Sequence, residues 1–179
     1  KNQLTLTKGI INNQNNNSFV IIENSDPNAI SSYGINSYIA NKIKRNVIST
    51  GSYDLPLGTT SYYELANINL NNAPSINYIS AKFNTPISPI DISGLGLYVN
   101  GTLLTELLNY GYWTIEQQGA TTIDYDITIT SRGHTNQGPF AAAHTIVKRE
   151  NSSSNWSLAG LHNNSDQAMG TDLNGTNWV

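Results

Sequence analysis

The chain has no cysteine, few charged residues and no long hydrophobic run. The missing cysteines exclude disulfides, cysteine nucleophiles and thiolate zinc sites. Only 12% of the 179 residues are charged, against about 25% in an ordinary globular protein, and Asn, Ser and Thr take their place. No apolar stretch approaches the roughly 20 residues that span a bilayer. The composition therefore predicts a neutral, hydrogen-bonding surface and no membrane span.

Basic residues are too scarce and scattered to predict a nucleic-acid partner. The formal net charge is -3, whereas binding to phosphates needs clustered Lys and Arg. The only basic cluster is "KIKR", residues 42–45. In a strand, alternation would send Lys42 and Lys44 to one side and Arg45 to the other. We interpret the cluster as a solvated strand face rather than an anion-binding site.

The two ends of the sequence carry no targeting signal. The start, "KNQLTLTKG", has neither an initiator Met nor the hydrophobic segment of a signal peptide. The last residues, "NGTNWV", end on an apolar pair. We expect a mature product or an internal fragment, with neighbouring domains of the same polypeptide as its partners.

Nearly every hydrophobic segment is short and β-branched or alternates with period two. Such strands, separated by Gly, Asn, Pro and Ser, predict an all-β fold, an antiparallel β-sandwich of jelly-roll or Greek-key type. The predicted strands are 3–11, 18–23, 37–48, 52–58, 62–70, 75–83, 96–100, 101–104, 111–117, 122–131, 141–150 and 155–162.

Three local patterns refine this prediction. Asn100-Gly101 predicts a hairpin with a type I′ turn, because both residues tolerate positive φ angles. In 122–131, Ile123, Tyr125, Ile127 and Ile129 fall on one face and polar residues on the other, which predicts one buried and one solvated side. The segment 103–111 fits either a short helix closed by Gly111 or a turn between strands.

The first 34 residues differ from the rest in their sequence pattern. Two short β segments are joined by "NNQNNNS", a run too polar to pack. This pattern is typical of rungs of a parallel β-solenoid. We therefore predict two regions: a solenoid-like segment, 1–34, packed on the domain, and a β-sandwich module, 35–179.

The histidines at 131–144, "SRGHTNQGPFAAAH", are the first of three weak site signals. Turn residues between Arg132 and Phe140 predict a hairpin connection that carries His134, with His144 on the return strand. A closed metal site needs three or four ligands, so we favour a structural role over adventitious metal binding or a ligand contact. G-x-S-x-G, H-E-x-x-H and glycine-rich phosphate loops are absent.

The other two signals are acidic. Asp124 and Asp126 share one strand face, whereas glycoside hydrolysis needs carboxylates on opposite sides of the scissile bond. "DLNGTN", 172–177, has spaced oxygen ligands, but its glycine comes early and no bidentate Glu follows, which favours a turn over a calcium loop. We therefore predict no catalytic residue, no metal ligand and no cofactor, and the ligand-binding residues are unknown.

The ten Tyr and three Trp leave a glycan-binding surface open, since rings stack on sugars while Asn and Thr meet their hydroxyls. Alternation nevertheless points one of Tyr112 and Trp113 inward, and Trp156 and Tyr125 also fit core positions.

Three segments together resemble a β-rich module of large proteins exported by the bacterial type IX secretion system. They are "TGSYDLPLGTTSYYELANINL" (50–70), "YGYWTIEQQGATTIDYDITI" (110–129) and "IVKRENSSSNWSLAGLHNNS" (146–165). The matching elements are Gly51–Gly58, Tyr112–Thr114, Tyr125–Ile129, Ile146–Arg149 and Trp156–Leu158. In that family a further strand and a sorting domain follow, whereas this sequence stops at Val179.

The resemblance implies a noncatalytic, extracellular or cell-surface structural or adhesin module, and it brings no catalytic residues. The alternative is a carbohydrate-binding module attached to a secreted hydrolase, with surface glycans as partners. Coplanar exposed aromatics in a groove would favour that alternative, and buried rings would favour the structural module.

Overall fold

The computed structural model describes residues 2–12, 18–72, 76–85, 90–119, 123–136, 144–160, 170–171 and 176–178. The chain forms two compact units: unit 1 comprises 1–85 and 112–130, and unit 2 comprises 86–111 and 131–179. The predicted division after residue 34 falls inside unit 1. In the described residues the only helical turn is the short 3₁₀ segment Ser93–Leu95, so the prediction of an all-β fold is confirmed.

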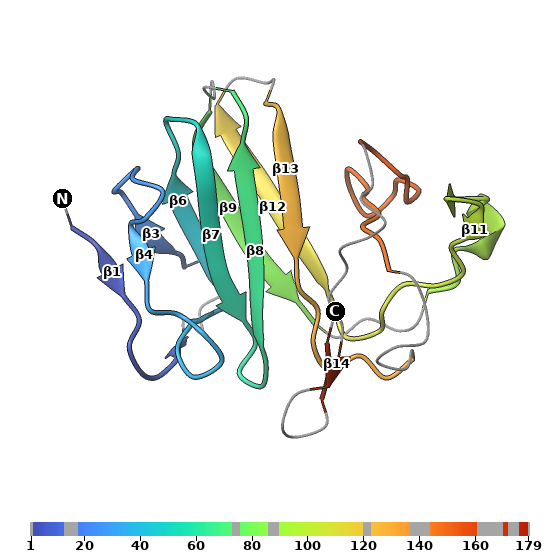
Figure 1. Ribbon diagram of the computed structural model, residues 1–179, viewed down its shortest axis with the longest axis horizontal. Helices are drawn as coiled ribbons and strands as arrows, with labels where there is room; N and C mark the ends of the chain where they lie inside the picture. The colour runs from blue at the N-terminus through green and yellow to red at the C-terminus, as the bar shows by residue number, and fades with distance from the viewer. Residues whose placement is uncertain are drawn as a thin grey trace. The chain divides into compact units, whose positions relative to one another are not determined.

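Unit 1 contains two main sheets (Figure 1). The five-stranded sheet has the order β13-β8-β7-β5-β2, and the four-stranded sheet has the order β12-β9-β6-β3. The five-stranded sheet comprises β2 (Ile11–Asn12), β5 (Ile39–Ala40), β7 (Gly51–Gly58), β8 (Tyr63–Leu70) and β13 (Tyr125–Ile129). The four-stranded sheet comprises β3 (Val20–Ile22), β6 (Lys42–Asn46), β9 (Ile76–Asn84) and β12 (Tyr112–Gly119). A separate pair joins β1 (Leu4–Thr5) to β4 (Ile30–Ser31).

The first strands pair in parallel, as stacked rungs do. Leu4 lies opposite Ile30, Ile11 opposite Ile39 and Val20 opposite Ile43. A third layer follows, because β5 also pairs in parallel with β7. The pairs β7–β8, β8–β13, β6–β9 and β9–β12 are antiparallel. Two strands of the solenoid-like segment, β2 and β3, thus belong to the two main sheets, and β1 and β4 form a pair of their own.

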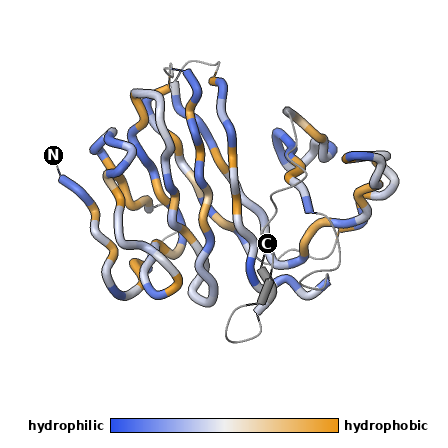
Figure 2. The backbone as a smooth tube through the Cα atoms, in the orientation of Figure 1, coloured by the Kyte–Doolittle hydropathy of each residue, from blue (hydrophilic) through white to orange (hydrophobic). Residues whose placement is uncertain are grey.

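Alternation along the strands builds the core between the sheets. On β8, Ala66, Ile68 and Leu70 are buried, whereas Leu65, Asn67 and Asn69 are only partly covered. Figure 2 shows the same alternation of hydrophobic and hydrophilic residues along the long strands. The fully buried apolar side chains of this core include Ile39, Ile43, Val47, Tyr53, Leu55, Leu57 and Ala66.

Arg45 corrects the interpretation of "KIKR" as a solvated face. Alternation does separate the side chains as predicted, but Arg45 is 0% exposed and points into the core. Its guanidinium donates to the backbone carbonyl oxygens of Asp54, at 2.6 Å, and of Asp26 and Pro27. It also stacks on the Tyr53 ring, 4.9 Å from the centroid. Burial lowers the pKa of Arg45, although a guanidinium remains charged.

Gly58 is required where β7 turns into β8. A Cβ at this position would lie 2.2 Å from the Tyr62 carbonyl oxygen and 2.8 Å from Cε2 of Tyr38. Tyr38 is buried against Tyr63, with ring centroids 5.6 Å apart. The glycine of the "DLPLG" segment therefore serves the packing of this corner.

In unit 2, β10 (Tyr98–Val99) and β11 (Thr102–Leu103) form the predicted hairpin. Asn100 has φ 50° and Gly101 has φ 80°, which confirms a turn with two positive φ angles. The helix considered for 103–111 does not form. Asp91 pairs with Glu106, and Ile92 and Leu107 donate backbone hydrogen bonds across the same two segments, so the backbone from 104 to 107 is extended.

The last two predicted strands are largely wrong within the described residues. Of 144–150 and 155–160, only Lys148 and Ser157 form an antiparallel bridge. Residues 141–143 and 161–162 lie outside the described ranges. The chain ends with an antiparallel pair of β14 (Gly170–Thr171) and β15 (Asn177–Trp178). None of the described segments is a helix long and apolar enough to cross a membrane.

Candidate ligand-binding face

His134 and His144 do lie together in unit 2. Their ring centroids are 6.1 Å apart and the planes are inclined at 54°. His134 is 1% exposed, and burial together with the neighbouring His144 lowers its pKa. Arg132 lies nearby in sequence and is half-buried. Among the described residues no group of three or more His, Cys, Asp or Glu could hold a metal ion.

The segment after His134 is fixed by a network of amide hydrogen bonds. Asn109 accepts from the Thr135 backbone N–H at 2.8 Å and donates to the Thr135 hydroxyl at 2.9 Å. Asn136 accepts from the Asn109 N–H and donates to the Leu107 carbonyl oxygen. These bonds join 107–109 to 135–136 and hold the buried histidine in place. Residues 137–143, which include the last part of the predicted turn, lie outside the described ranges.

The carboxylates of Asp124 and Asp126 are exposed, as alternation predicts. Asp126 accepts from the side-chain amides of Asn69 and Asn71 on and just after β8, at 3.4 and 3.2 Å. Its contacts are thus to neutral amides on the neighbouring strand. The candidate calcium loop, 172–177, lies mostly outside the described residues, and only its last two residues are placed.

The aromatic predictions are partly right. Trp113 points inward, where its ring meets Phe83 edge-on at 5.5 Å and its Nε1 donates to the Thr130 carbonyl oxygen. Tyr112 is the outward member of the pair. Tyr125, placed on the core face by alternation, is 37% exposed at the end of the edge strand β13. Trp156 is half-buried beneath Arg149, 4.5 Å from the guanidinium carbon.

The outer face of the four-stranded sheet brings together polar side chains and one aromatic ring that are far apart in the sequence. We call this set the lysine face. Its residues are Phe19, Lys42, Lys44, Ser80, Lys82, Asn84, Thr114 and Glu116.

Strand register brings two lysines of this face together. Lys42 on β6 lies directly opposite Lys82 on β9, and Thr114 on β12 flanks Lys82 on its other side. In the next row Lys44 faces Ser80, and Ser80 faces Glu116. Like charges directly opposite one another on a sheet repel each other, and the carboxylate of Glu116 lines the same hollow as the two lysines.

The ammonium groups of Lys42 and Lys44 lie near aromatic rings, and Asn84 is hydrogen-bonded to its neighbour. Nζ of Lys42 lies 5.4 Å from the centroid of Phe19, and Nζ of Lys44 lies 4.4 Å from that of Tyr78. The side-chain amide of Asn84 donates to the Thr114 hydroxyl at 2.8 Å. The lysine face therefore presents fixed ammonium, amide and hydroxyl groups.

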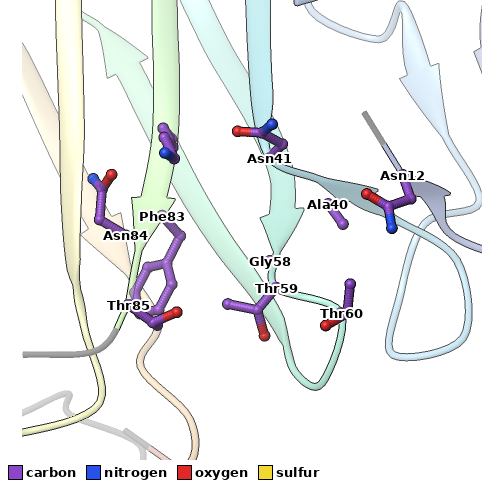
Figure 3. A pocket seen from close by; sticks show the side chains of 10 residues that line it. Asn12, Ala40, Asn41, Gly58, Thr59, Thr60, Phe83, Asn84 and Thr85 are labelled. Carbon is purple, nitrogen blue, oxygen red and sulfur yellow. The ribbon is translucent and has the colours of Figure 1, made fainter. Parts of the chain in front are cut away.

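Two hollows adjoin at Lys82 and Asn84. The face hollow, about 200 Å³, lies between Phe19, Lys42 and Glu116 on the outer side of the sheet. The end hollow, about 250 Å³, lies at the rim where β5, β7 and β9 end. Figure 3 shows the end hollow surrounded by amide and hydroxyl side chains, those of Asn12, Asn41, Thr59, Thr60, Asn84 and Thr85.

Asn41 occupies a strained position beside the end hollow. It is the single residue between β5 of one sheet and β6 of the other, and its φ is 119°. Residues with a Cβ rarely adopt such a backbone conformation. The sharp crossing between the sheets explains the strain, and it brings the Asn41 side chain to the hollow.

Sequence reasoning missed the lysine face. Lys42 and Lys44 were noticed, but Lys82 is distant in sequence and only the register of β6 against β9 brings it alongside. The available signal was the shared alternation of "KIK" and "SAK", each with a small or apolar residue between polar ones.

Comparison of the chain with protein-family models, with curated protein sequences and with solved structures found no match.

Proposed function

We propose that the chain is a noncatalytic structural or adhesin module of a cell-surface protein exported by the type IX secretion system. The observation that carries the proposal is the continuity between parallel rungs and antiparallel sheets. β5 pairs in parallel with β2 on one side and with β7 on the other. Stacked rungs transmit contacts along one axis, so a sandwich continuous with them suits a rigid spacer.

The residues that carry the resemblance serve the fold. Gly58 permits the close approach of Tyr38 and Tyr62, and Tyr53 is fully buried with its hydroxyl 3.0 Å from the Ser49 carbonyl oxygen. Trp113 ties β12 to the end of β13. A motif whose members pack and cap the sheets supports a structural module.

Surface labelling in the bacterium that produces the protein tests the proposal. Antibodies raised against the purified chain should label intact cells, and deletion of a type IX secretion component should abolish the label and leave the protein in the periplasm. A control antibody against an outer-membrane protein inserted by another route should label both strains equally. Surface label that survives the deletion, or protein found in the cytosol, would contradict the proposal.

A second candidate function, a carbohydrate-binding module attached to a secreted hydrolase, is favoured by the end hollow. Amides and hydroxyls of Asn41, Thr59 and Asn84 lie around it, and such groups match the hydroxyls of a sugar. A glycan array probed with the purified chain tests this role. Saturable binding to a defined set of glycans supports it, and an array with no binding above background contradicts it.

A further inference from the structure

We propose that the lysine face binds an acidic saccharide, whose carboxylate or sulfate group lies between Lys42 and Lys82. The inference deepens the second candidate function by naming the ligand class, and it does not depend on the export route.

The distribution of charge is the first support. The whole chain is formally negative and has only nine Lys and Arg residues. Three of them, Lys42, Lys44 and Lys82, lie on one face of a four-stranded sheet. Two occupy directly opposed positions, so an anion bound between them would be attracted by both ammonium groups.

The groups around the lysines indicate which chemical groups the ligand carries besides its anionic group. The Thr114 hydroxyl accepts a hydrogen bond from the side-chain amide of Asn84, whereas the buried Ser80 hydroxyl donates to Glu116. Hydroxyl and amide groups of this kind bind sugar hydroxyls, and the Phe19 ring at the edge of the face hollow offers an apolar surface to a sugar ring. One anionic group with several hydroxyls around it fits this set.

Glu116 and Glu23 argue against a dense polyanion. Glu116 lines the face hollow and accepts a hydrogen bond from Ser80 at 3.5 Å. Glu23, at the end of the same face, accepts from the Tyr78 hydroxyl at 2.7 Å. A nucleic acid laid across the face would bring phosphates against both carboxylates. A saccharide with spaced charges can place hydroxyls there, because a carboxylate accepts hydrogen bonds from them.

The dimensions suit a short oligosaccharide. Each hollow is smaller than the roughly 300–1,000 Å³ typical of small-molecule sites, and the two share Lys82 and Asn84. A chain of sugars can therefore place its acidic unit at the face hollow and a neighbouring unit among the amides of the end hollow.

Calorimetric titration of the whole chain tests the proposal. The probes are trigalacturonic acid, its methyl ester, which keeps rings and linkages but removes the charge, a sulfated galactose trisaccharide, and single-stranded DNA. We expect saturable binding of one or both acidic trisaccharides, weaker binding as salt is added, and much weaker binding of the ester and of DNA.

Matched variants locate the site. Lys82→Gln and Lys42→Gln should each lower the affinity for the acidic trisaccharide by about tenfold, the value of one hydrogen bond to a charged group. Lys82→Arg should retain binding, and Lys8→Gln, the same charge change at an exposed position away from this face, should not alter it. Because Lys82→Gln relieves the opposition of like charges, its melting temperature without ligand should not fall.

Three results would overturn the proposal: no binding of either acidic trisaccharide, equal binding of the ester or of DNA, or equal loss in Lys8→Gln. Binding of neutral glycans alone would leave the second candidate function standing while removing this inference. If Lys82→Gln fails to fold, Lys42→Gln and Lys82→Arg decide.

Discussion

Arg45 connects the first segment of the chain to the two main sheets. It is fully buried and donates to carbonyl oxygens of Asp26 and Pro27 in the first segment and of Asp54 on β7. Substitution would leave these acceptors unpaired in the core, which costs about 1–3 kcal/mol for each group.

We therefore expect Arg45→Met to lower the free energy of unfolding by about 3 kcal/mol or more. Urea unfolding followed by circular dichroism would measure the loss. Lys44→Met, on the same strand but outward-facing, is the matched control and should change stability little. Equal stability of Arg45→Met and the wild type would show that the buried guanidinium is not required.

Asn41 allows backbone strain to be measured separately from side-chain contacts. Asn41→Ala and Asn41→Gly both remove the amide, but only alanine keeps a Cβ at φ 119°. We expect the glycine variant to be more stable than the alanine variant by about 1 kcal/mol. Thermal unfolding of the two variants provides the comparison, and an alanine variant as stable as the glycine variant would refute strain at this corner.

Residue-level prediction from sequence succeeded where chemistry is local. Asn100-Gly101 specified its turn, and alternation required one of Tyr112 and Trp113 to point inward, although only the structure shows that it is Trp113. It failed for Arg45, because alternation separates the two faces of a strand without telling which one meets the other sheet. The abundance of positive charge in "KIKR" favoured the solvated interpretation, yet three backbone carbonyls and the Tyr53 ring compensate the buried guanidinium.

At the scale of elements, β5 is short but central. Ile39 lies between β2 and β7 in parallel pairings and is 0% exposed. At the other edge of the same sheet, Thr130 joins the end of β13 to β8. Its hydroxyl donates to the Glu64 carboxylate at 2.8 Å and accepts from the Leu65 N–H.

Ile39→Ala should lower stability by about 2–5 kcal/mol and increase amide exchange in β2 and β5 more than in β8 and β13. Hydrogen exchange with mass spectrometry measures both regions in one experiment. Ile10→Ala, at a side chain that is 41% exposed, is the control. Uniform loss of protection throughout unit 1 would show that the rungs and sheets unfold as one element.

The sequence predicted most of these elements because period-two alternation is explicit in 51–58, 63–70 and 112–119. It did not predict the pairing between them. Strands of two or three residues, such as β2 and β5, are too short for their alternation to indicate which strands pair in parallel. The extended backbone of 104–107 was missed because its Leu residues also fit a helical spacing, and the contact with 90–92 overrides that preference.

At the scale of the whole molecule, the two units should respond differently to acid. In unit 2 burial and His144 lower the pKa of His134, so the unfolded state binds a proton more readily than the folded state. The contribution of His134 to the free energy of unfolding is fully present above its unfolded-state pKa of about 6.5. This contribution is lost as the pH falls from the unfolded-state pKa toward the lower pKa of the folded state.

Between about pH 7.5 and about pH 5 we expect amide protection in 107–109 and 134–136 to fall. His134→Phe should remove most of this dependence, while unit 1, which contains no histidine, serves as the internal control. Hydrogen exchange at the two pH values makes the measurement. A pH dependence that persists unchanged in His134→Phe would assign it to other groups.

The most direct test of the functional surface is a titration of the isotopically labelled chain with trigalacturonic acid, followed by the shifts of its backbone amides. If the ligand binds the lysine face, the shifted amides should form a contiguous set on β6, β9 and β12, centred on Lys42, Ser80, Lys82 and Thr114. The same shifts should be absent when the methyl ester is added. Shifts confined to unit 2 around His134, or spread evenly over the chain, would contradict binding at the lysine face.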